Sequence, residues 1–168
     1  MPLIVETGQG VEDADSYVSL ADARTISSNY GWSLPADDTL AEVALRNGAM
    51  YTDQFESEYQ GDRTTEIQGL AFPRTGVTCR GKDIGDNDIP KDLIKAQVRA
   101  ASTAAEGDIN PDFDGKQVAS ESVSGAVSVS YFQTGGNGSI KITQADNLLK
   151  CFKSLNQIGV NQFLVSRG

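Results

Sequence analysis

The sequence predicts a mainly α-helical fold: a small bundle of about four helices with an appended β-hairpin and extended N- and C-terminal arms. Several segments carry apolar residues at helical spacing, and the longest of them, from Ile89 to Glu106, is also rich in Ala. From Val127 to Tyr131 apolar and polar residues alternate instead, which predicts the hairpin. Because 168 residues can bury one sizeable core, we expect a single domain that spans residues 1–168.

The segment from Ile89 to Glu106 is the predicted central helix. Pro90 suits its first turn, where a missing N–H has no intrahelical partner, and Gly107 suits its end. The buried side carries Ala rather than larger residues in its C-terminal half, so neighbouring helices can approach closely. We therefore expect the helical core, residues 19–116, to form around this helix.

The chain begins with a segment rich in Gly and acidic residues, which predicts an extended N-terminal arm over residues 1–18. Within the arm, the stretch from Gly8 to Gly10 lacks the preceding strand and following helix of a phosphate-binding loop, so we expect it to be flexible. The capping box from Ser19 to Asp22 then predicts a short helix that ends at Gly31.

A second capping box, from Thr39 to Glu42, predicts a longer helix that continues to about Phe55. Gly48 lowers the helix propensity of this segment but permits close contact with another helix. The residues expected to face inward recur at helical spacing, and they are Leu40, Val43, Ala44, Met50, Tyr51 and Phe55.

A long connection without helical periodicity follows, from Glu56 to Asp88, and Gly and Pro interrupt it repeatedly. Connections of this length inside a compact domain are uncommon and are usually functional or fixed by specific contacts. The residues expected to fix it are Leu70, Phe72 and Pro73 by packing, and Arg63 and Arg74 by pairing with carboxylates or carbonyls. We therefore predict that Phe72, Pro73 and Arg74 form a structural motif rather than part of a substrate site.

Residues 117–132 are the predicted β-hairpin. A lone hairpin is marginally stable in water, so it needs a surface on its own bundle or on another subunit. We expect the second arrangement, in which Val127, Val129 and Tyr131 pack against a neighbouring subunit. Residues 133–142 are rich in Gly and are predicted to be a flexible loop.

A third capping box, from Thr143 to Asp146, predicts a closing helix over residues 143–156. Its apolar stripe consists of Ala145, Leu148, Leu149, Phe152 and Leu155. The predicted C-terminal tail, residues 157–168, contains an apolar triplet that needs a partner surface. A basic residue near its end can pair with acidic residues at the rim of that surface. These tail residues are Phe163, Leu164, Val165 and Arg167, and the alternative is that the triplet folds back as a strand on the hairpin of its own chain.

The composition does not indicate an enzyme. Histidine is absent, which removes the commonest general base and the commonest metal ligand. The acidic stretch from Asp83 to Asp88 lacks the Gly and the closing Glu of a calcium loop. Cys79 and Cys151 have no metal-type spacing and are expected to be reduced thiols. We therefore expect no catalytic, cofactor-binding or metal-binding residues.

The formal net charge of −9 argues against a free-standing nucleic-acid-binding protein, because such proteins gain affinity by neutralising phosphates with Lys and Arg. Aromatic residues that could stack on bases are expected to pack in the core instead, and they are Tyr17, Tyr30, Trp32, Tyr51, Phe55 and Tyr59. No segment is long and apolar enough to span a membrane, and the first residues do not resemble a signal peptide, so we expect a soluble cytoplasmic product.

Three segments resemble, in order, the motifs of a tailed-phage protein family. Residues 14–19, Ala-Asp-Ser-Tyr-Val-Ser, resemble its Ala-Asn-Ser-Tyr-Val-Ser opening, and residues 68–76 resemble its Gln-x-Leu-x-Trp-Pro-Arg-x-Gly block. Ile89 and Pro90, followed by the Ala-rich helix, resemble the third motif. The chain departs from the family pattern at Asp15, where Asn is usual, and at Phe72, where Trp is usual.

This family is often labelled DnaT-like ssDNA-binding, and it is similar to the head-to-tail connector (adaptor) proteins of tailed phages. The resemblance implies a structural virion protein that assembles as a homo-oligomeric ring, expected to be a dodecamer, beneath the portal protein. The ring would extend the DNA channel, let DNA pass without specific binding and offer a docking surface to a tail or tail-completion protein. Single-stranded DNA binding in phage replication is the alternative function.

In a connector the protein would assemble in the host cytoplasm and act in the virion neck. The C-terminal residues Phe163, Leu164, Val165 and Arg167 are then expected to dock on the portal. Acidic residues are expected to outnumber bases on the inner wall of the ring, because a transiting polyanion should not stick there.

Overall fold

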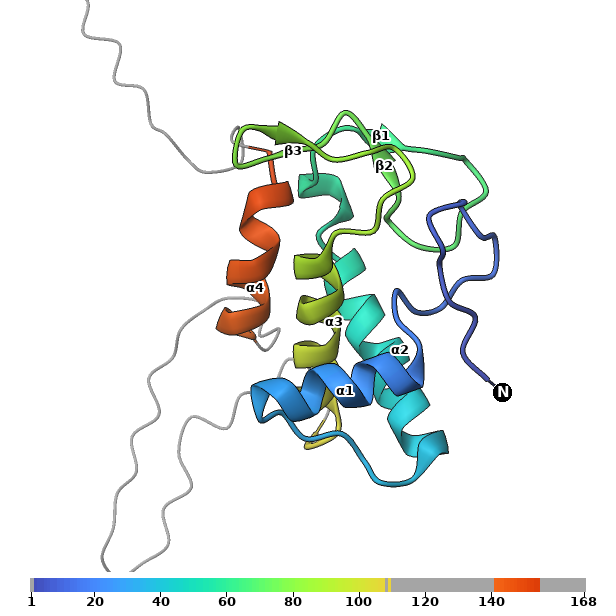
Figure 1. The fold of residues 1–168 in the computed structure, drawn as a ribbon, viewed down its shortest axis with the longest axis vertical. Coiled ribbons are helices and arrows are strands. Elements are labelled where there is room, and N and C mark those ends of the chain that lie inside the picture. The colour runs from blue at the N-terminus through green and yellow to red at the C-terminus, as the bar shows by residue number, and fades with distance from the viewer. Residues whose placement is uncertain (1, 108, 110–140, 155–168) are drawn as a thin grey trace, which may run out of the picture.

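The computed structural model describes residues 2–107, 109 and 141–154 (Figure 1). Within these residues the chain forms four helices and two small antiparallel hairpins. The helices are α1 (Leu20–Tyr30), α2 (Asp38–Asp53), α3 (Lys91–Ala104) and α4 (Thr143–Leu149), with short 3-10 helices η1 (Glu56–Glu58) and η2 (Lys150–Phe152). The hairpins pair β1 (Asp62–Arg63) with β2 (Arg74–Thr75), and β3 (Thr78–Cys79) with β4 (Lys82–Asp83).

The described part is therefore a small mixed fold rather than the mainly α-helical fold that the sequence predicts. The difference arises in the long connection between α2 and α3, which forms η1 and both hairpins. Figure 1 shows α3 between α4 and α2, with α1 crossing in front and the hairpins at one end of the helices. None of the helices among the described residues is long and apolar enough to cross a membrane.

The contact between α2 and α3 depends on small residues, as the Ala-rich sequence of α3 predicts. Ala96, Ala100 and Ala101 are fully buried on α3. A Cβ atom on Gly48 of α2 would lie 2.4 Å from the backbone oxygen of Gln97, so only glycine permits this approach. The two helix axes can therefore lie close together along these residues.

Gln97 joins α3 to the N-terminal arm and to α2, although its side chain is fully buried. Its Nε2 donates to the Ser16 hydroxyl at 2.8 Å and to the Leu45 backbone oxygen at 2.9 Å. Its Oε1 accepts a hydrogen bond from the backbone N–H of Tyr17 at 2.9 Å. Because all three polar contacts are made inside the chain, the buried amide is satisfied.

The predicted ends of the helices are confirmed in some cases and shifted in others. Ser19 caps α1, since its hydroxyl accepts from the N–H of Asp22, and Gly31 ends α1 in the left-handed conformation. The cap of α2 is Asp37, two residues before the predicted Thr39. The closing helix is shorter than predicted, because α4 ends at Leu149 and continues only as η2.

Three of the residues predicted to face inward on α2 are exposed instead: Leu40 by 59%, Val43 by 48% and Met50 by 64%. The buried side of α2 carries Ala41, Ala44, Leu45, Gly48 and Ala49, together with Tyr51 and Thr52. The helical period was right, but the side that meets α3 is the one with small residues. An apolar stripe is thus left on the outer side of the helix.

The prediction of two reduced thiols is wrong, because Cys79 and Cys151 form a disulfide. Their Cα atoms lie 5.3 Å apart although 72 positions separate them in the sequence. The fold packs η2 against β3, which brings the two cysteines together. The bond therefore links the end of the closing helix to the long connection.

Two predicted elements lie outside the described residues. These are the hairpin of residues 117–132, with Val127, Val129 and Tyr131, and the tail of residues 157–168, with Phe163, Leu164, Val165 and Arg167. Of the predicted flexible loop, residues 133–142, the structure describes only the last two, and Ile142 is buried. The expectations for the hairpin and the tail therefore stay predictions.

Candidate functional site

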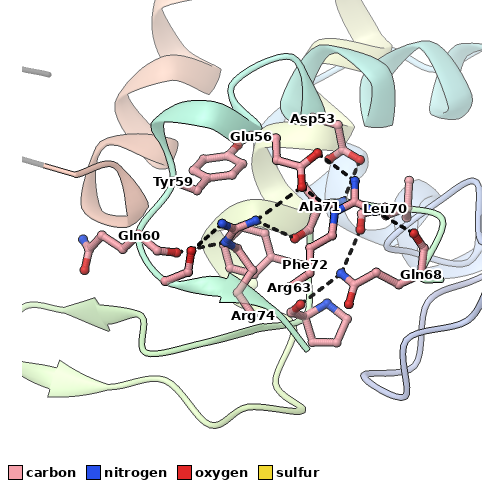
Figure 2. A network of polar contacts seen from close by, with 12 residues as sticks. Asp53, Glu56, Tyr59, Gln60, Arg63, Gln68, Leu70, Ala71, Phe72 and Arg74 are labelled. Atoms are coloured by element: carbon pink, nitrogen blue, oxygen red, sulfur yellow. Dashed lines mark hydrogen bonds and ion pairs between the residues drawn. The ribbon is translucent and has the colours of Figure 1, made fainter. Parts of the chain in front are cut away.

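The block from Gln68 to Arg74 lies in the middle of a polar cluster that joins η1 to the two strands of the first hairpin (Figure 2). The peptide bond between Phe72 and Pro73 is cis. Phe72 is fully buried, and its ring meets those of Tyr59 and Phe152 edge-on at centroid distances of 5.2 and 5.8 Å. The predicted packing of this block onto the core is observed.

Arg74 follows the cis bond, and its side chain is only 7% exposed. Its Nε donates to the backbone oxygen of Gln60 at 2.9 Å, and its Nη2 donates to that of Gly61 at 2.6 Å. Its Nη1 donates to the Ala71 backbone oxygen at 3.4 Å and approaches Glu56 Oε1 at 3.5 Å. The guanidinium therefore holds two backbone segments in place through three carbonyls.

Arg63 contacts the same carboxylate from the other side (Figure 2). Its Nε and Nη2 both donate to Glu56, the second at 2.7 Å, and its Nη1 donates to the Gln68 backbone oxygen at 2.9 Å. These hydrogen bonds lower the pKa of the Glu56 carboxyl. Glu56 is thus kept ionised between two guanidinium groups.

Gln68 closes the cluster from inside the hairpin loop, with 3% of its surface exposed. Its Nε2 donates to the backbone oxygens of Leu70 and Pro73, at 2.8 and 3.0 Å. Its Oε1 accepts from the N–H of Thr65 at 3.0 Å. The side chain therefore substitutes for a backbone partner on both sides of the turn.

Asp53, at the end of α2, connects the cluster to the N-terminal arm. The Tyr17 hydroxyl donates to Asp53 Oδ1 at 2.6 Å, and the Ala71 N–H donates to Oδ2 at 2.9 Å. The Phe72 N–H in turn donates to the Tyr17 hydroxyl at 3.2 Å. Burial raises the pKa of the Asp53 carboxyl to about 6 and raises that of Tyr17 as well.

The cluster makes its contacts within its own chain. Arg63 and Arg74 donate to carboxylate and carbonyl oxygens of the connection itself, and the Asp53 carboxylate accepts from Tyr17 and Ala71. Such an arrangement fixes a backbone turn but leaves these arginines engaged rather than available to a ligand. Its chemistry is that of a structural network.

The first glycines of the chain form a second polar centre, and the expectation that they are flexible is wrong. The carboxylate of Glu6, which is 3% exposed, accepts hydrogen bonds from four successive backbone N–H groups. The donors are Gly8, Gln9, Gly10 and Val11, at 2.7 to 3.0 Å. Concave N–H arrays of this kind bind anions, and here the anion is the chain's own carboxylate.

Half of the chain's 14 basic residues form ion pairs with carboxylates among the described residues. These bases are Arg24, Arg46, Arg63, Arg74, Arg80, Lys95 and Lys153. A paired base offers less to a phosphate, because a competing carboxylate must be displaced. Ion pairing and the net charge of −9 thus both weaken the attraction of this chain for nucleic-acid phosphates.

Half of the six aromatic residues considered for base stacking are buried, and one pair is accessible. Tyr17, Tyr51 and Tyr59 lie in the core. Tyr30 is 50% exposed and stacks on Trp32 with ring centroids 4.8 Å apart. The Nζ atom of Lys95 lies 5.6 Å from the centre of the Tyr30 ring. Within the part of the chain that the structure describes, this aromatic pair therefore lies at the surface beside a lysine.

The sequence pointed to the block around Phe72 and to its arginines, but not to their partners. Glu56, Asp53 and Gln60 were missed because acceptors of this kind occur throughout the chain and have no characteristic spacing. Glu6 was also missed, although an acid shortly before a Gly-x-Gly stretch could have indicated a carboxylate that folds back onto the following N–H groups.

Fold and site together define a small mixed domain that is stabilised by internal polar networks, and its described residues contain no group of His, Cys, Asp and Glu side chains that could hold a metal ion. Over residues 1–167 the chain matches the family described as "Putative DnaT-like ssDNA binding protein", and it belongs to this family. Neither a curated protein nor a solved structure matches the chain. The description of the family names single-stranded DNA binding.

Proposed function

We propose that the chain is a head-to-tail connector, a structural virion protein that forms a ring beneath the portal and extends the DNA channel. The observation that supports this most is electrostatic: a net charge of −9, with half of all bases held by the chain's own carboxylates. A surface of this kind repels a polyanion and lets DNA slide past. Ring assembly and binding to the portal are inferred from the resemblance to connector proteins.

The partner surfaces of this proposal come from the sequence. Val127, Val129 and Tyr131 are the predicted contact with a neighbouring subunit. The tail around Phe163 and Arg167 is the predicted contact with the portal. A tail or tail-completion protein would bind the opposite end of the ring.

Single-stranded DNA binding is the second candidate function, and the family description favours it. Tyr30 and Trp32 could stack on a base, while Lys91 on the neighbouring helix could contact a phosphate, and Lys95 could do so on leaving Asp92. Lys91 forms no ion pair within the part of the chain that the structure describes.

Two measurements on the full chain separate the two functions. A connector should not retard single-stranded DNA at low salt and should sediment with the portal protein. A single-stranded DNA-binding protein should retard DNA at low salt, lose this binding steeply as salt rises, and lose it also in Tyr30→Ala. Retardation that depends on Tyr30, without association with the portal, would reverse our ranking.

A further inference from the structure

The outer side of α2 carries an apolar stripe that the described part of the chain leaves uncovered. Leu40, Val43 and Met50 share one side of the helix, and they are exposed by 59, 48 and 64%. We call these three residues the α2 ridge. Single exposed apolar residues are ordinary, but three large ones on one side of a helix mark an interaction surface, here with the exposed Asn47 between Val43 and Met50.

A second candidate contact surface is the groove between α1 and the first turns of α3, which we call the α1–α3 groove. Its volume is about 480 Å³. The lining is mainly apolar and includes Val5, Tyr17, Val18, Ile26 and Ile94. Its charged lining residues are Lys91, Lys95 and Asp22, so bases outnumber acids there. The groove therefore suits an apolar ridge that is flanked by acidic residues.

The ridge and the groove are different surfaces of the molecule. Gly48 and Leu45 contact Gln97 of α3, so the ridge faces away from α3, whereas the groove lies partly on α3. A contact between the two surfaces thus needs two copies of the chain. Because the described residues of each copy leave one ridge and one groove uncovered, the contact can repeat and close into a ring.

One pair of charges beside the two surfaces is complementary. Glu42 lies on α2 next to Val43, and Lys91 lies in the groove. Neither side chain forms an ion pair among the described residues. By contrast, the C-terminal segment 155–168 contains Arg167 and no acidic residue, so it fits a lysine-lined groove less well.

We propose that the α2 ridge of one copy docks in the α1–α3 groove of a second copy, with Glu42 facing Lys91. This inference rests on the proposed function, because it supplies a contact from which the connector ring is built. It assigns the ring contact to the described helices, in addition to the predicted hairpin of residues 117–132.

The first test is sedimentation of the full chain over a range of concentrations, with Met50→Glu and the control Ile67→Glu. Both side chains are exposed to a similar extent, 64 and 65%, so both variants should fold with unchanged circular dichroism and melting temperature. We expect Met50→Glu to weaken self-association by at least about tenfold, and Ile67→Glu to leave it unchanged.

The second test exchanges the charges. Lys91→Glu and Glu42→Lys should each weaken self-association at low salt, and the double variant should restore it to within about threefold of the wild type. A full chain that stays monomeric at every concentration overturns the inference. So does equal association of the Met50 and Ile67 variants, or a double variant no better than the single ones.

Three further outcomes distinguish another occupant of the groove, failure of this inference alone, and failure of the proposed function alone. If truncation after Ser154 abolishes association while Met50→Glu does not, the tail is the contact and the inference is wrong. If Met50→Glu still binds the portal and forms rings, the inference fails but the connector function stands. If the portal is never bound while the ridge and groove variants dissociate the oligomer, the function fails and the inference stands.

Discussion

The helix pair α2–α3 and the connection from Gln54 to Pro90 are held by different kinds of contact. Between the helices, Gly48 and the alanines of α3 allow a close backbone approach with little polar content beyond Gln97. In the connection, Arg63 and Arg74 bond to Glu56 and to several backbone carbonyls. One region is fixed by shape, and the other by hydrogen bonds.

The two regions are vulnerable to different substitutions. A packed helix pair can relax by small shifts when a side chain changes, so its losses are moderate. A buried guanidinium that satisfies several carbonyls leaves all of them unpaired when it is removed. We therefore expect single substitutions in the connection to cost more than crowding in the helix pair.

The largest effect is expected for Arg74→Ala. The change leaves the carbonyls of Gln60 and Gly61 without their donor and should lower the free energy of unfolding by about 3–5 kcal/mol. Urea denaturation measures it. Arg80→Ala is the matched control, because Arg80 lies in the same connection but its side chain is 80% exposed, and it should cost less than about 1 kcal/mol. Equal effects of the two variants would contradict the contrast.

Removal of the disulfide should have the next largest effect. The bond joins residues separated by 72 positions, and the loss of the cross-link in Cys79→Ala/Cys151→Ala should destabilise the protein by about 4 kcal/mol through the unfolded state. Melting with and without reductant tests this. Reductant should lower the melting temperature of the wild type and leave that of the variant unchanged. A wild type that titrates with two free thiols after air oxidation would disprove the bond.

Asp53 links the two regions and should make stability depend on pH. Its carboxyl pKa rises from 3.8 to about 6 on folding, so the folded state holds this proton more tightly. The contribution of Asp53 is fully present below its unfolded pKa of 3.8 and is lost as pH rises through 6, a change of about 3 kcal/mol.

The difference between the wild type and Asp53→Asn isolates this dependence. We expect the unfolding free energy of the wild type to fall relative to the variant between pH 4 and 7, as measured by urea denaturation at each pH. The exposed Asp86→Asn should show the same dependence as the wild type. Parallel curves for the wild type and Asp53→Asn would count against a raised pKa.

The smallest effect is expected in the helix pair. A Cβ atom in Gly48→Ala would meet the Gln97 oxygen at 2.4 Å, and overpacking of this kind costs more than the helix propensity of Ala returns. The net loss should be about 1–2 kcal/mol in thermal denaturation. Asn47→Ala, on the exposed outer side of α2, should be neutral or slightly stabilising. A stabilised Gly48→Ala would show that the helices are not in close contact.

Features that depend on residues close together in the sequence, such as several helix ends, were predicted correctly. Ser19, Gly31 and Pro90 marked helix ends correctly, since caps act within one turn. The inward face of α2 was wrong because periodicity gives a helix its stripes but does not say which stripe meets a partner. Leu40 and Met50 looked like core residues for that reason.

The candidate site was predicted only in part, because its contacts are long-range. Phe72 and Arg74 stood out by type and context, whereas Asp53 gained its role from Tyr17, far away in the sequence. The same holds for Cys79 and Cys151, which no local pattern could pair. Backbone carbonyls, the main partners of Arg74, are invisible in any sequence.

The disulfide also determines what a protease can separate. Cys79 and Cys151 close a covalent circle that includes α3 and every residue from 107 to 141. A backbone cut anywhere in that stretch leaves α4 attached to the rest of the molecule through sulfur. Nicked protein should therefore run as one species on a non-reducing gel and as two fragments after reduction. While the disulfide is intact, α4 should stay packed on α3.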